Sequence, residues 1–115
     1  MRLCPCARTV VWLAAVVALA AARPAAAQTS NWTSAASGTW GTPGNWDAQP
    51  PVGGGATVVL NFPETGTIYT ATDDLAGLFT FNALNFSNTN AVTVNAAAPA
   101  TGLVSGGTGA AVNST

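Results

Sequence analysis

Few side chains after residue 27 could carry chemistry. A pair of carboxylates can hydrolyse a glycosidic bond, and carboxylate and amide oxygens can hold calcium. Exposed tryptophan rings can stack on sugars. The carboxylates are Asp47, Glu64, Asp73 and Asp74, and the tryptophans are Trp32, Trp40 and Trp46.

The carboxylates do not form a recognisable catalytic pair. Asp73 and Asp74 are adjacent, and neighbouring residues on an extended strand point to opposite faces. Nothing in the sequence fixes their separation from Glu64, so we interpret all three as solvated turn residues. Calcium binding would add nearby amides, but the spacing matches neither an EF-hand loop nor a calcium-binding nonapeptide. Those amides are Asn82, Asn88 and Asn90. We predict no catalytic residue and no metal site.

Several residue types are missing after residue 27. The basic residues Arg2, Arg8 and Arg23 and both cysteines precede that point, and the chain has no histidine. Nucleic-acid binding depends on Lys and Arg, hydrolytic triads need His or Lys, and zinc sites are built from Cys and His. We therefore expect no nucleic-acid partner, no cofactor and no enzymatic activity.

Residues 1–27 have the pattern of a secretory signal peptide. Arg2 and Arg8 give a positive start, and residues 9–22 form an apolar run that is short for a membrane-spanning helix. The alternative is an N-terminal membrane anchor, but small residues suited to signal peptidase follow the run. We expect Sec-type export to an extracytoplasmic, secreted or cell-surface location, including the outer membrane, with no membrane span in the mature segment. The expected cleavage residues are Ala25, Ala27 and Gln28.

The segment after the signal peptide is predicted to have two parts. Residues 28–56 form a tryptophan-rich capping segment that is rich in Gly, Pro and Asn turn residues. Residues 57–115 form a region of short β-repeats, with little to offer a core from Ala96 onward. The expected strands are 57–62, 67–72, 78–81 and 91–95, with a bend at Asn82-Ala83.

The fold class that this pattern predicts is all-β. The succession of short strands favours the start of a β-solenoid, or β-helix, and a small β-sandwich is the alternative. Asparagines at the corners could stack into side-chain ladders, or could simply mark ordinary loops.

Two hypotheses remain for the role of Trp32, Trp40 and Trp46. They could stack on a surface polysaccharide, which would make the segment a carbohydrate-binding module. They could instead cover the exposed end of the first coil of a solenoid, where apolar core and an unpaired edge need protection. We favour the capping role.

One stretch resembles a known family. It consists of Ser37-Gly38-Thr39-Trp40, then Asn45-Trp46, then Pro50-Pro51, then a strand ending in Phe62. This pattern is similar to the N-terminus of large secreted bacterial proteins with autotransporter-associated β-strand repeats, many of which carry a C-terminal sorting anchor. Residues 73–88, with their Phe79–Phe86 core, resemble the first such repeat.

The resemblance implies a non-catalytic, structural or adhesin-like passenger role at the cell surface. It also implies that further β-repeats of the full-length chain are natural partners, and that the present chain is a truncated fragment. It brings no catalytic residues.

Overall fold

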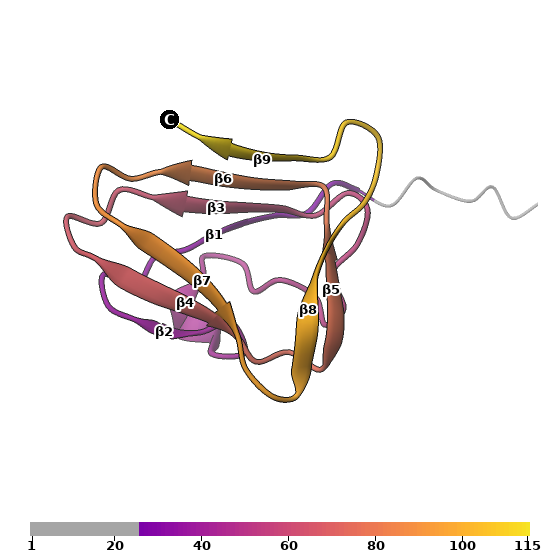
Figure 1. Ribbon diagram of the computed structural model, residues 1–115, viewed down its shortest axis with the longest axis horizontal. Helices are drawn as coiled ribbons and strands as arrows, with labels where there is room; N and C mark the ends of the chain where they lie inside the picture. The colour runs from indigo at the N-terminus through magenta and orange to yellow at the C-terminus, as the bar shows by residue number, and fades with distance from the viewer. Residues whose placement is uncertain (1–25) are drawn as a thin grey trace, which may run out of the picture.

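The computed structural model describes residues 26–115, and within that range the chain is all-β and contains no α-helix (Figure 1). The all-β prediction is therefore confirmed. The strands form three sheets, and one short 3-10 helix, η1 (Pro43–Asn45), lies between the second and third strands. Most of the predicted signal peptide, including Ala25, lies outside the described residues.

Every pair of neighbouring strands within these sheets is parallel. The four-stranded sheet contains, in spatial order, β1 (Thr29–Asn31), β3 (Val59–Pro63), β6 (Ala83–Ser87) and β9 (Ala111–Ser114). The three-stranded sheet contains β2 (Gly38–Thr39), β4 (Tyr69–Asp73) and β7 (Val92–Ala96). The two-stranded sheet contains β5 (Gly77–Phe81) and β8 (Ala100–Ser105).

The chain visits the three sheets in the same order each time, and we call one such passage a circuit. The first circuit is residues 29–55, the second is 59–81, the third is 83–105, and β9 begins a fourth. The first circuit reaches the third sheet only through a bridge between Gly54 and Thr80. Figure 1 shows β1, β3, β6 and β9 lying one above another along one side, with β5 and β8 along another.

Alternation of apolar and polar residues explains which side of each strand faces inward. In β3, Leu60 and Phe62 are buried while Asn61 between them is only half-buried. A period of two places one set of side chains on the interior face of a strand. The buried apolar residues are Trp32, Trp40, Trp46, Val58, Leu60, Phe62, Tyr69, Ala71, Leu75, Phe79, Phe81 and Leu84.

The strand predictions are confirmed with shifts of one or two residues at their ends. The expected bend lies at Asn82, between β5 and β6, and it brings both Phe81 and Leu84 into the core. The sandwich alternative is wrong, because such sandwiches are built from antiparallel neighbours. The residues after Ala96 form β8 and β9, although their side chains remain mostly exposed.

Within residues 26–115, no helix is long and apolar enough to cross a membrane.

Candidate functional site

The three tryptophans lie together inside the first circuit. Trp46 lies between the other two rings, with centroids 5.1 Å from Trp32 and 5.8 Å from Trp40 in edge-to-face geometry. The Nε1 of Trp32 donates to the carbonyl of Ser34 at 2.8 Å, and that of Trp46 donates to the carbonyl of Trp40 at 3.2 Å. The rings are 0%, 0% and 5% exposed for Trp32, Trp40 and Trp46.

Aromatic rings of the second circuit lie directly over the tryptophans. The Phe62 ring is within 6.3 Å of Trp32, 6.3 Å of Trp40 and 5.7 Å of Trp46, measured between centroids. On one side Tyr69 stacks on Trp32 at 5.8 Å, and burial raises the pKa of Tyr69 to about 12. The rings therefore close the interior at its N-terminal end.

This burial corrects the premise of the carbohydrate-stacking hypothesis. Stacking on a sugar needs a ring face that solvent can reach. Trp32, Trp40 and Trp46 offer no such face, because their faces and edges contact one another and the rings above them.

A ladder of four asparagines runs along the outside of the four-stranded sheet. Asn31, Asn61, Asn85 and Asn113 occupy equivalent positions in the parallel register. The Nδ2 of Asn61 donates to the Oδ1 of Asn31 at 2.6 Å, and Asn85 donates to Asn61 at 2.8 Å. Asn113 donates to Asn85 at 2.7 Å. All these donors point toward the first circuit.

Asp47 terminates this ladder at the first circuit. Its Oδ2 accepts from the Nδ2 of Asn31 at 2.6 Å, and its Oδ1 accepts from the backbone N–H groups of Asn31 and Ala48. The side-chain bond from Asn31 is the main cause that lowers the pKa of Asp47 below its ordinary value. A carboxylate only accepts, so it ends the series of donors.

Of the two hypotheses for the corner asparagines, ordinary loop residues fit the structure and stacked ladders do not. Asn82, Asn88 and Asn90 lie at bends and turns and do not stack on one another across circuits. The ladder lies on strand residues instead. One signal could have found it: Leu60-Asn61-Phe62 is repeated identically as Leu84-Asn85-Phe86.

Glu64 and Asp74 accept hydrogen bonds from backbone N–H groups. Glu64 accepts from the N–H of Gly66, from the N–H and Oγ1 of Thr89, and from the Nδ2 of Asn90, and so joins the second circuit to the third. Asp74 Oδ1 accepts from the N–H of Gly41 at 2.6 Å. Both therefore have structural partners that sequence reasoning missed.

Asp73 differs, because it is buried rather than solvated as predicted. Its Oδ1 accepts from the N–H of Leu75 at 3.0 Å, while its Oδ2 is buried without a hydrogen-bond partner. Burial is the main cause that raises the pKa of this carboxyl, and the neighbouring Asp74 adds to it. No group of three potential metal-binding side chains occurs in residues 26–115.

Glu64 makes the fold sensitive to acid. Hydrogen bonds from Thr89 and then Gly66 lower its pKa from 4.5 to about 2. Because the folded-state pKa is below the unfolded value, the stabilisation is fully present above about pH 4.5 and is lost as the pH falls toward 2. We expect Glu64→Gln to be less stable than the wild type at neutral pH and to lose less stability across that window.

Urea denaturation at a series of pH values measures this difference. Asp47 still titrates in the variant, so part of the acid sensitivity must remain. Parallel pH profiles for the two proteins would show that Glu64 has no such role.

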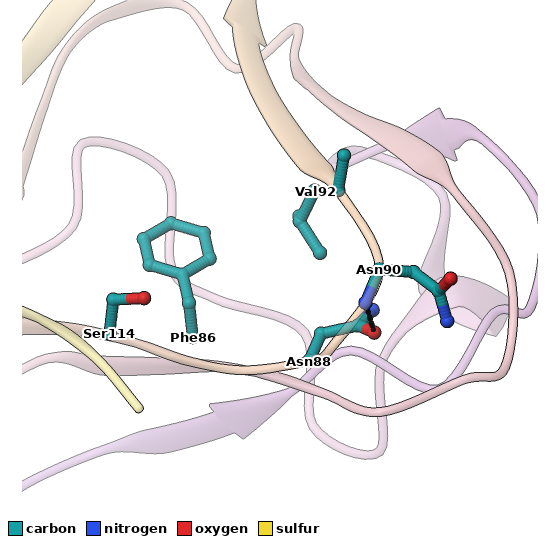
Figure 2. A pocket seen from close by; sticks show the side chains of 6 residues that line it. Phe86, Asn88, Asn90, Val92 and Ser114 are labelled. Atoms are coloured by element: carbon teal, nitrogen blue, oxygen red, sulfur yellow. Dashed lines mark hydrogen bonds between the residues drawn. The ribbon is translucent and has the colours of Figure 1, made fainter.

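The opposite end of the interior is open. Val112 aligns with the buried Leu84 but is 63% exposed, and Leu103 aligns with the buried Phe79 but is 36% exposed. A hollow of about 330 Å³ lies at this end, and Figure 2 shows Phe86 and Val92 beside it, with Ser114 nearby. Its lining consists of Phe86, Asn88, Asn90, Ala91, Val92 and Ser114.

Of the predicted cleavage residues, Ala27 and Gln28 are described. Ala27 is exposed and precedes β1, while the carbonyl of Gln28 accepts from the N–H of Val59 at 2.8 Å. A cut before Gln28 would therefore leave every strand intact.

Comparisons of the chain with protein-family models, with curated proteins and with solved structures found no match.

Proposed function

We propose that residues 28–115 are the capped start of a β-solenoid in a secreted or cell-surface bacterial protein, with a non-catalytic, structural or adhesive role. The observation that carries this proposal is the contrast between the two ends of the interior. Tryptophan rings cover the N-terminal end, whereas Val112 and Leu103 are exposed at the other end.

The repeated circuits support the solenoid. β3 pairs with β6, β4 with β7 and β5 with β8, and all three pairs are parallel. The register is continuous in the first two pairs and shifts once, between Gly77 and Leu78, in the third. Stacked units that contact only their neighbours are the basis of solenoid proteins, and their terminal units need a covering segment. The aromatic cluster of Trp32, Trp40 and Trp46 suits that task.

The location and family rest on the sequence. The signal-peptide pattern supports export, and the tryptophan spacing supports membership among secreted proteins with autotransporter-associated β-strand repeats. The described carboxylates have backbone or amide partners, and this favours structural roles for them over a hydrolytic one.

Tryptophan fluorescence of the exported chain tests the proposal. We expect blue-shifted emission, weak quenching by acrylamide and no change on titration with a panel of polysaccharides, because all three rings are buried. Far-UV circular dichroism of the same sample should show strands as the dominant structure.

A saturable shift with one polysaccharide would make carbohydrate binding the better account. Substantial helix content in circular dichroism would contradict the solenoid. Unfolding the sample in urea supplies the control, since it must move the emission to the red and restore quenching.

A further inference from the structure

We infer that the free edge of β9 takes a further parallel strand carrying an apolar–Asn–aromatic triplet, that is, another circuit of this chain's own repeat. This inference rests on the proposed solenoid start and specifies what its open end recognises. Asn113 is the residue that would select the incoming strand, through its side-chain amide.

The direction of the asparagine ladder determines the chemistry of that strand. Each Nδ2 donates to the Oδ1 of the preceding asparagine, so Asn113 uses its Nδ2 on Asn85 and presents its Oδ1 at the β9 edge. An incoming asparagine can donate to this Oδ1, whereas an aspartate can only place a second acceptor against it. The edge therefore favours Asn at this register.

The Asn–aromatic pair of this triplet occurs at every strand below this edge, and in β3 and β6 an apolar residue precedes it. Ser30-Asn31-Trp32, Leu60-Asn61-Phe62 and Leu84-Asn85-Phe86 each place an aromatic residue after the ladder position. Phe86 stacks on Phe62 with centroids 5.1 Å apart. The fourth strand has Ser114 there, and the small side chain leaves the hollow beside Phe86 that a ring from above can cover (Figure 2).

The N-terminal end of another copy is a poor occupant. The outer side of β1 is already covered by residues 45–47. The Thr33 N–H donates to the backbone carbonyl of Asn45 at 2.9 Å, and the Asp47 N–H donates to the backbone carbonyl of Asn31 at 3.0 Å. Asp47 also takes the ladder donor of Asn31. A copy stacked head to tail would bring the Asp47 carboxylate, and no amide donor, toward Asn113.

The open face also carries no charged side chain. No charged residue follows Asp74, so β7, β8 and β9 carry none of the charges that protect exposed edges. The uncharged edge and the exposed Val112 fit an uncharged, apolar strand.

A peptide that copies residues 82–88, with a fluorophore and a lysine tag for solubility, tests the inference by anisotropy on the exported full chain. Two further peptides carry Asn85→Asp and Asn85→Ala. At neutral pH we expect the Asn peptide to bind about ten-fold more tightly than the Asp peptide, with the Ala peptide between them. The Asn113→Ala chain should lose this discrimination.

Asn95→Ala is the matched control, because Asn95 is an exposed strand amide on β7 outside the ladder. That variant should bind the three peptides with the same order of affinities as the wild type. Equal binding of the peptides to the wild type, or no binding of the Asn peptide, would overturn the inference. A dimer that Asn113→Ala abolishes, without peptide discrimination, would overturn it too and would identify a second copy as the occupant. The fluorescence and dichroism tests of the proposed function are independent of all these outcomes.

Discussion

Replacing Phe62 with alanine is expected to lower the free energy of unfolding by about 3–5 kcal/mol, as removal of a fully buried aromatic ring does. Phe62 is 0% exposed and lies between the tryptophans of the first circuit and Phe86 of the third. Its loss removes contacts on both sides and leaves a cavity that rings held on strands fill poorly. The total free energy of unfolding of a domain of this size is roughly 5–15 kcal/mol, so the variant should be only marginally stable.

Urea denaturation followed by tryptophan fluorescence gives the measurement, and Phe86→Ala is the matched comparison. Phe86 has the same side chain and is the ring that stacks on Phe62, but it is half-buried at the open end. Phe86→Ala should therefore lower the free energy of unfolding clearly less than Phe62→Ala does. Ile68→Ala, at a side chain 72% exposed, should change stability by less than about 0.5 kcal/mol. Equal losses at Phe62 and Phe86 would show that the aromatic cluster is not the centre of the fold.

Local patterns in the sequence were sufficient to predict β3, β4, β5 and β7, but not β1, β2, β8 or β9. Alternation in residues 57–62 placed Leu60 and Phe62 on one face, and both are buried in β3. The change of phase after Phe81 required a bend, and the bend lies at Asn82. These predictions succeed because side-chain alternation is a property of the strand itself.

The asparagine ladder could not be predicted from alternation within one strand, and its one signal was the repeat of Leu60-Asn61-Phe62 as Leu84-Asn85-Phe86. A ladder depends on register between strands that are far apart in the sequence, and a pattern within one strand does not contain that register. Asn61 therefore looked like an ordinary polar residue, although it aligns with Asn31 and Asn85. Trp46 directly follows η1, and its ring enters the core from there.

The connector Gly53-Gly54-Gly55 has a structural role that its composition did not reveal. It lies against β5, where Gly55 N–H donates to the carbonyl of Thr80 at 2.7 Å and Thr80 N–H donates to the carbonyl of Gly53 at 3.0 Å. Gly54 has a φ of +66°, and a Cβ added there would lie 1.9 Å from the Thr80 oxygen. Only glycine allows the backbone to approach so closely.

Gly54→Ala should therefore lower the free energy of unfolding by about 3–5 kcal/mol, from left-handed strain together with displacement of the connector from β5. Gly53→Ala separates the two causes, because Gly53 has a φ of +77° but nothing within 4 Å of an added Cβ. That variant should lose only about 1–2 kcal/mol. Gly44→Ala, which has neither the positive φ nor a neighbour within 4 Å, should stay within about 0.5 kcal/mol of the wild type. Urea denaturation of the three variants measures the order of their losses in the free energy of unfolding. Equal losses for Gly53→Ala and Gly54→Ala would show that the contact with Thr80 does not hold the first circuit to the second.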